Sequence, residues 1–306
     1  MRFLTKYTII IITLIFLTSC TRSSNQTSYL KIGLMPTMDS VVVATAYELG
    51  FFDEFGVNVE LVPFSSARER DAAFLAGLLD GATVDLIAVG LFNEADIFTR
   101  ATSVTTAHFT LIANPNYKTL KELENKTVMI SHNTAIDFVL DQMLSYYNLD
   151  SDYIVREEVG NIPTRFEMVR TLQADAALIS EPFATMAKSE GLTQITDTLT
   201  IDFNPFVLAF SLEAIENRVD DIRNFYKAYQ LAVEYLNNQA DVIIKQKIID
   251  IIGFPDTAAD YIELPIFLEP ALPSENITQV ALDWLINRNL VASDTTIEMF
   301  FYDIFQ

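Results

Sequence analysis

The 306-residue sequence contains one cysteine, two histidines and only 20 basic residues against 41 acidic ones, a formal net charge of −21. A single cysteine excludes a disulfide-linked scaffold, and a zinc site built from Cys and His has almost no ligands to draw on. A nucleic-acid-binding protein needs a basic surface, so this acidic chain argues against that function. Half of the residues are hydrophobic, which argues against a disordered chain because a core can form.

Long apolar runs are also scarce, and the only one stands near the N-terminus. Eleven residues from Tyr7 to Leu17 follow the basic residues Arg2 and Lys6. This run suits the hydrophobic part of a signal peptide and is shorter than the roughly 20 residues that span a bilayer. No later segment has 18 consecutive apolar residues, so we expect the rest of the chain to be soluble.

The run ends in Leu17-Thr18-Ser19-Cys20, which resembles the bacterial lipobox. The resemblance implies a lipoprotein signal peptide at 1–19, a lipid on Cys20, a tether at 20–29 and a protein anchored to the cell membrane, facing the periplasm or cell exterior. The alternative is an ordinary secretory signal with a chance cysteine. Cleavage would remove 19 of 306 residues and two positive charges, leaving 287 residues and lowering the charge from −21 to −23.

Alternating strand and helix patterns begin at Tyr29. Residues 57–62 alternate with period two and predict a strand, and Ser66 with Glu69 forms a capping box that predicts a helix. We interpret 84–89 as a buried strand. Strand, polar turn and helix recur at 32–40 and 128–134, and this repetition predicts an α/β protein with two lobes. Each lobe is expected to be a mostly parallel sheet flanked by helices.

The last third of the chain is predicted to be mainly helical. Residues 220–237 and 274–289 carry aromatic and aliphatic side chains at helical spacing. We interpret these stripes as core packing, and no cofactor is expected.

In parallel α/β sheets, ligands bind beyond the carboxyl ends of strands, where helix N-termini offer free N–H groups. Four polar turns satisfy this rule, at 37–40, 64–66, 131–134 and 180–183. They could be ordinary helix caps, but their recurrence in both halves favours a site. Phenylalanines nearby could stack on a planar ring or belong to the core. The candidate ligand-binding residues are Asp39, Ser40, Phe64, Ser65, Ser66, Arg68, Thr83, Ser131, His132, Asn133, Thr134, Glu181, Phe183 and Phe206.

Signatures of catalysis are missing. The sequence has no G-x-S-x-G, no phosphate-binding G-x-x-x-x-G-K-[ST] and no H-E-x-x-H. Ser131 and His132 are adjacent, and adjacent residues rarely give the geometry of a nucleophile and its base. We therefore expect no enzyme activity and no metal site.

Several segments resemble a known family. Residues 32–36 with Asp39-Ser40, then 48–52 and 55–64, are similar to the solute-binding lipoproteins of ABC importers in the sulfonate, nitrate and thiamine-precursor binding family. The similarity continues through 68–85, 161–168 and 175–182.

The resemblance implies a periplasmic-binding-protein-like fold of type II, with two lobes joined by two crossovers. Lobe 1 would comprise 30–112 and 205–306, and lobe 2 would comprise 113–204. A cleft between the lobes would close on a small molecule. The implied partners are an ABC permease and its ATPase, and we expect a monomer.

The charges of the candidate turns and of the whole chain bear on which class of ligand the protein binds. The candidate turns contain Asp39 and Glu181 with few cations, and the acidic surface disfavours small anions. We therefore favour a vitamin-type heterocycle, a thiamine-precursor pyrimidine or riboflavin. The alternatives are a sulfonate, nitrate or other small anion, and, less favoured, an exported enzyme on the same fold. The cysteine-rich motif of related fungal pyrimidine synthases is missing.

Overall fold

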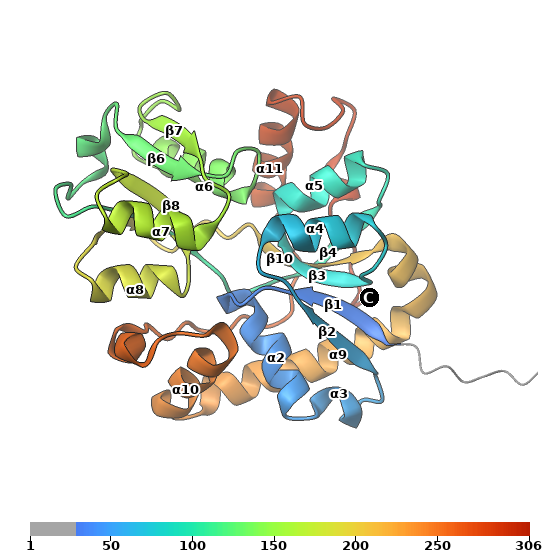
Figure 1. Cartoon of the computed structure of the whole chain (residues 1–306). Coiled ribbons are helices and arrows are strands. Elements are labelled where there is room, and N and C mark those ends of the chain that lie inside the picture. Colours follow the sequence, from blue (N-terminus) through green and yellow to red (C-terminus); the bar gives the residue numbers. More distant parts are fainter. Residues whose placement is uncertain (1–28) are drawn as a thin grey trace, which may run out of the picture.

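The computed structural model describes residues 29–306, apart from the side chains of 256–258. The expected signal peptide, Cys20 and all of the tether except Tyr29 therefore lie outside the described residues. Within the described part, the chain forms two five-stranded sheets, each covered by helices (Figure 1). This arrangement confirms the expected α/β fold class.

The first sheet has the strand order β2-β1-β3-β10-β4. Strand β1 pairs in parallel with β2 and with the central strand β3, whereas β10 runs antiparallel to its neighbours β3 and β4. The strand bounds are β1 (Leu30–Leu34), β2 (Val59–Pro63), β3 (Gly81–Asp85), β4 (Thr99–Val104) and β10 (Phe206–Ser211).

The second sheet repeats this topology in the order β7-β6-β8-β5-β9. Here β5 is the reversed strand, antiparallel to β8 and β9, while β6 pairs in parallel with β7 and β8. The strand bounds are β5 (Phe109–Ala113), β6 (Thr127–Ile130), β7 (Val155–Glu158), β8 (Ala176–Ser180) and β9 (Thr193–Asp197).

The chain passes between the sheets twice, after β4 and after β9. The expected boundary between residues 112 and 113 is wrong, because Ile112 pairs with Ala177 and all of β5 lies in the second sheet. An apolar strand pattern cannot show which of two sheets a strand joins, so this boundary moves to the segment before Phe109.

Helices surround both sheets (Figure 1). The helices are α2 (Val41–Glu48), α3 (Phe51–Glu54), α4 (Ala67–Leu75), α5 (Leu86–Glu94), α6 (Ala135–Tyr146), α7 (Ile162–Arg170), α8 (Phe183–Ser189), α9 (Leu212–Asn238), α10 (Asp241–Ile252) and α11 (Glu275–Asn287), with short 3-10 helices η2 (Met38–Ser40), η3 (Leu120–Leu123), η4 (Asp256–Tyr261) and η5 (Ile297–Met299).

One segment has a secondary structure that differs from the predicted one. The apolar run 84–89 is not one strand, because β3 ends at Asp85 and α5 begins at Leu86. The Asp85 carboxylate accepts the backbone N–H of Ala88 at 2.9 Å and caps α5. A short apolar run fits a buried strand and a buried helix equally well. Ser66 caps α4 as the sequence predicts, since its hydroxyl accepts the N–H of Glu69 at 3.3 Å. The predicted capping box is incomplete, because Glu69 Oε2 accepts the N–H of Ser65 at 3.3 Å rather than that of Ser66.

The apolar core falls into three clusters. The aromatic stripe of α9, including Phe225 and Tyr229, is fully buried against the first sheet, which confirms its role in the core. Another cluster is shared by both lobes and contains Leu86 of α5, Phe138 of α6 and Leu285 of α11. Figure 1 shows α11 beside α5 at the junction of the two lobes.

Candidate functional site

Asp39 and Ser40 lie in η2, just beyond the carboxyl end of β1, and both are buried. The Thr37 hydroxyl donates a hydrogen bond to Asp39 Oδ1 at 2.5 Å. Burial raises the pKa of Asp39, while Thr37 and the positive charge of Arg70 act in the opposite direction. The Ser40 hydroxyl has no hydrogen-bond partner within the described residues.

Arg70 and Asp85 extend this polar group along the end of β3. Arg70 is 5% exposed and donates from Nη1 to the backbone carbonyl of Thr83 at 2.8 Å. Its Nε and Nη2 donate to Asp71 at 2.9 and 2.7 Å. Burial raises the pKa of Asp85 to about 6, although the charge of Arg70 lowers it.

Two further hydroxyl groups belong to this region. Thr83 is buried, and burial raises the pKa of the Tyr229 hydroxyl, with the Asp39 charge acting in the same direction. Neither Thr83 Oγ1 nor the Tyr229 hydroxyl has a hydrogen-bond partner among residues 29–306. The first lobe therefore collects buried carboxyl and hydroxyl groups around one arginine, which is itself paired with Asp71.

In the second lobe, Glu181 follows β8 and is 8% exposed. Its carboxylate accepts the backbone N–H of Thr185 at 3.0 Å and the Thr185 hydroxyl at 3.1 Å. His108 Nε2 lies 3.4 Å from Glu181 Oε1. His108, the residue before β5, therefore contacts a candidate site residue.

The turn 131–134 is occupied by carboxylates of the chain itself. Glu158 accepts the Ser131 hydroxyl at 3.3 Å and the His132 backbone N–H at 2.6 Å. Asp137 accepts the Asn133 N–H at 3.2 Å, and Thr134 caps α6 through the N–H of Ile136 at 3.2 Å. An anion would have to compete with Glu158 for the donors of this turn.

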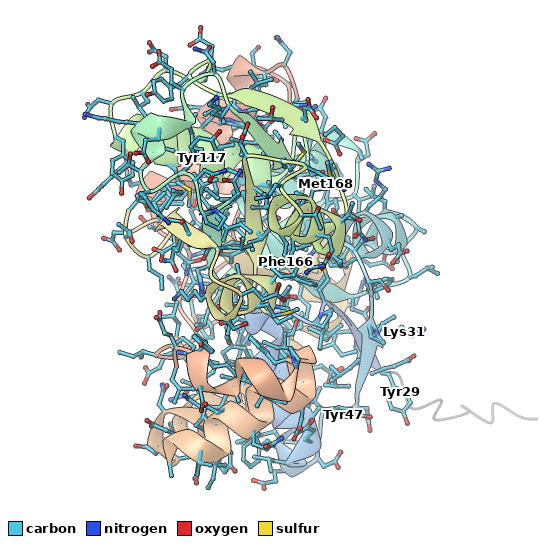
Figure 2. The ribbon with its side chains drawn as sticks, turned by 60° about the vertical axis from the view of Figure 1, so that its left-hand side comes forward. Tyr29, Lys31, Tyr47, Tyr117, Phe166 and Met168 are labelled. Carbon is cyan, nitrogen blue, oxygen red and sulfur yellow. The ribbon has the colours of Figure 1, made fainter. Side chains whose placement is uncertain are left out.

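The candidate phenylalanines engage neighbouring rings. Phe206 is 5% exposed and meets Phe109 edge-on, with ring centroids 4.8 Å apart. Phe183 packs against Phe166 with centroids 5.6 Å apart, and Figure 2 labels Phe166 on α7. Phe64 packs against the cluster shared by both lobes. The sequence left two interpretations of these phenylalanines, core packing and stacking on a ligand. The contacts favour core packing.

Arg68 and Arg70 lie in different environments, one exposed and the other buried. Arg68 is exposed, as is Ser65, while Ser66 is occupied in capping α4. Arg70, two positions further along the helix, points to the interior. Sequence reasoning missed Arg70, Asp85 and Tyr229 as site residues. The capping position of Asp85 at a strand-to-helix junction was the signal that could have revealed it.

Two surface cavities lie elsewhere. One of about 250 Å³ lies at the N-terminal end of β1 and is lined by Tyr29, Lys31, Asp80 and Arg218 among others; Figure 2 labels Tyr29 and Lys31 close together at this edge. The other, about 110 Å³, lies between α5 and the C-terminal segment and is lined by residues such as Arg100. Neither cavity contains a candidate site residue.

Two properties of residues 29–306 bear on membranes and metals. No helix in this part of the chain combines the length and apolarity needed to cross a membrane. In the same part, no group of three or more His, Cys, Asp or Glu side chains is placed to hold a metal ion.

The two sheets of mixed strands, each flanked by helices, match the periplasmic binding protein fold. The chain belongs to the NMT1-like family, whose model matches residues 23–252. Among sequence relatives, a protein of Brachyspira hyodysenteriae named as an ABC transporter periplasmic binding protein is 23% identical over 257 residues. That match covers 76% of this chain and 73% of the relative.

Solved structures share the fold at low sequence identity. An alkanesulfonate-binding protein from Xanthomonas axonopodis pv. citri, bound to MOPS, matches with a TM-score of 0.76 and 14% identity, covering 90% of this chain and 98% of that one. A periplasmic nitrate-binding protein from Synechocystis PCC 6803 matches with a TM-score of 0.71 and 14% identity, covering 88% and 84%. A desulfurization enzyme also shares the fold, at a TM-score of 0.63 and 14% identity, covering 89% and 96%.

Proposed function

We propose that this protein is an extracytoplasmic solute-binding protein of an ABC importer that captures a small molecule between its two lobes. Family membership and the relative named as an ABC transporter periplasmic binding protein support this function. The polar groups at the carboxyl ends of β1, β3 and β8 support the position of the site. The partners would be a permease and an ATPase, and the protein would act as a monomer.

The ligand we propose is a neutral or weakly basic heterocycle of the vitamin type, such as a thiamine-precursor pyrimidine or riboflavin. The observation that carries this choice is the placement of two carboxyl groups near Arg70, the buried Asp39 and the half-buried Asp85, whose pKa values are both raised by burial. Such carboxyl groups are suited to ring N–H and amino donors, and they gain from a basic ring nitrogen.

A small anion is the alternative, because structures with this fold include sulfonate- and nitrate-binding proteins. Two contacts disfavour it here. Asp71 already occupies two donors of Arg70, and Glu158 occupies the turn before α6. An anion would meet repulsion from the carboxylates and would have to displace one of them.

The anchor we propose is a lipid on Cys20, with residues 20–29 as a tether. Tyr29 directly precedes β1 in the first sheet, so the tether would join the membrane to the first lobe. The protein would then be lipid-anchored to the cell membrane and face the periplasm or the cell exterior.

Thermal-shift measurements test the binding function. The probes are 4-amino-5-hydroxymethyl-2-methylpyrimidine, riboflavin, ethanesulfonate and nitrate, each added to the purified chain without residues 1–19. A ligand at 100 times its Kd stabilises the folded state by about 2.7 kcal/mol, which corresponds to a rise of about 5 °C in melting temperature. We expect this rise with a heterocycle and none with the anions. A response to ethanesulfonate or nitrate alone would overturn the ligand class, and turnover of a bound probe would favour an enzyme.

A further inference from the structure

Apart from the two crossovers, the lobes meet along two edges. At one edge, α6 of the second lobe lies against α5 and, through side-chain contacts, against α11. At the other edge, α8 of the second lobe packs against η4. These edges differ sharply in the chemistry of their contacts.

The α6–α11 edge contains a cluster of ion pairs around the fully buried Asp137, which we call the Asp137 cluster: Asp137, Asp141, Arg156 and Arg288, whose side chains are 0, 14, 15 and 30% exposed. Asp137 has no exposed surface, and its Oδ2 accepts Arg288 Nη1 at 2.8 Å. Asp141 Oδ2 accepts Arg288 Nη2 at 2.8 Å. Arg156 of β7 contacts Asp137 at 3.4 Å and Asp141 at 2.5 Å. Arg288, the residue directly after α11, therefore bridges two carboxylates of the second lobe.

Aromatic contacts reinforce this edge. The indole Nε1 of Trp284 donates to Asp141 Oδ2 at 2.8 Å. The Arg288 guanidinium lies over the Trp284 ring, 4.3 Å from its centroid, and Phe138 of α6 meets that ring at 5.4 Å. Such a cation–π contact is strengthened when it is shielded from water.

The helix α11 is held equally closely to the first lobe. A Cβ atom at Gly90 of α5 would lie 2.4 Å from Leu285 Cδ1 of α11 and 3.1 Å from the Phe300 ring. A side chain at this position would require Leu285 or Phe300 to shift, so glycine suits the close approach of the two helices. Because α11 is packed on α5 and ion-paired to α6, it connects the lobes without a covalent link.

The α8–η4 edge is weaker. Its ion pair joins Lys188 Nζ to Glu263 Oε1 at 2.8 Å, with side chains 29% and 81% exposed. Exposed pairs of this kind stabilise a contact little, whereas breaking a buried, hydrogen-bonded pair is costly because it strands a charge away from water. If the lobes separate, the α8–η4 edge therefore opens first.

We propose that the Asp137 cluster with α11 is a third, non-covalent hinge, so that the lobes open along the α8–η4 edge and the ligand enters there. This inference rests on the proposed binding function. The candidate residues are placed accordingly. Glu181 lies two residues before the start of α8. The 3-10 helix η2, which holds Asp39, contacts α10, and α10 in turn contacts η4.

The hinge is also joined to a candidate ligand turn. Asp137 Oδ2, which accepts Arg288, also accepts the backbone N–H of Asn133 at 3.2 Å, and His132 Nδ1 lies 3.6 Å from it. Asp137 is therefore a positioning residue for the turn 131–134. Loss of Arg288 would loosen this turn as well as the hinge.

Distances between spin labels in the ligand-free protein test the hinge, using a chain in which Cys20 is replaced. One labelled pair, Ser145→Cys with Asn287→Cys, spans the α6–α11 edge. The other, Glu190→Cys with Asp260→Cys, spans the α8–η4 edge; all four positions are exposed. We expect a single narrow distance distribution for the first pair and a broad distribution with a long-distance component for the second.

The variant Arg288→Gln should broaden the 145–287 distribution and lengthen its mean. Arg288→Lys, which keeps the charge but cannot bridge both carboxylates, should have a smaller effect in the same direction and guards against a folding defect. The matched control is Arg223→Gln, since Arg223 donates to backbone carbonyls of Ile304 and Gln306 within the first lobe; it should leave both distributions unchanged.

Two results would overturn the hinge: a 145–287 distribution as broad as that for 190–260 in the unmodified protein, or an Arg288→Gln variant that folds with an unaltered 145–287 distribution. Neither readout uses a ligand. A failed hinge is thereby distinguishable from a failed binding function, which shows as no thermal shift with any probe.

Discussion

Phe109 and Phe206 meet edge to face, with ring centroids 4.8 Å apart, and each is the first residue of the reversed strand in its sheet. The start of β5, which follows the first crossover, therefore packs against the start of β10, which follows the second crossover. This contact joins the two lobes beside their crossovers.

Truncation of this ring should destabilise the fold. Phe206→Ala removes a buried ring, and we expect the free energy of unfolding to fall by about 3 kcal/mol. Urea denaturation measures the change. Phe98→Ala is the control, because Phe98 is 54% exposed and its loss should cost about 0.5 kcal/mol or less. Equal effects of the two substitutions would contradict the packing role of Phe206.

Asp85 makes stability depend on pH. Its pKa is raised from 3.8 to about 6 by burial, so the folded protein holds this proton more tightly than the unfolded chain. The resulting stabilisation is fully present below about pH 4 and is lost as pH rises through about 6. It amounts to at most about 3 kcal/mol, since one pKa unit corresponds to about 1.4 kcal/mol.

Asp85→Asn isolates this contribution, because asparagine also caps helices well. The unfolding free energy of wild type minus that of the variant, measured at pH 4 and pH 7, should be larger at pH 4. A difference that does not change with pH would show that Asp85 titrates normally in the folded protein.

Asp39 should contribute to ligand affinity more than to stability. Asp39→Asn keeps the shape of the side chain and can still accept the Thr37 hydroxyl. Loss of a charged hydrogen bond to the ligand costs about 1.5–3 kcal/mol, so we expect roughly a 10- to 100-fold weaker Kd by calorimetry. The control is Asp53→Asn on the exposed surface of α3. An unchanged Kd in Asp39→Asn would remove Asp39 from the site.

Gly90 lies where α11 approaches α5 closely enough for a Cβ atom to clash with Leu285. The Cβ of Gly90→Ala would lie 2.4 Å from Leu285 Cδ1, and overpacking of this kind costs about 1–3 kcal/mol. Alanine regains about 1 kcal/mol through its helix propensity, so we expect a net loss of up to about 2 kcal/mol in thermal or urea unfolding. The double variant Gly90→Ala with Leu285→Ala should relieve the clash. A Gly90→Ala variant that is more stable than wild type would show that the clash does not destabilise the protein.

The proposed membrane anchor depends on Cys20. In the full chain, Cys20→Ser should abolish incorporation of labelled palmitate and move the protein from the detergent phase to the aqueous phase in Triton X-114 partitioning. A hydrophobic chain of this kind contributes about 0.8 kcal/mol per buried CH₂ to membrane binding. Ser19→Ala, which keeps the residue before the cysteine small, serves as the control. Unaltered partitioning of Cys20→Ser would leave an ordinary secretory signal as the explanation.

Local features of the sequence determined much of this protein. Ser66 with Glu69 predicted the start of α4, and the aromatic spacing of residues 220–237 predicted the buried face of α9. The alternation of strands and helices predicted two α/β lobes, and it did so because side-chain periodicity and capping depend only on near neighbours along the chain.

Tertiary structure decided what depends on distant partners. Whether Phe109–Ala113 joined the first or second sheet was set by its pairing with β8, and whether 84–89 became strand or helix was set by the cap at Asp85. The cation beside Asp39 is Arg70 rather than Arg68, because packing turned one face of α4 inward. The bridge from Arg288 to Asp137 joins residues 151 positions apart, and only the folded chain brings those charges together.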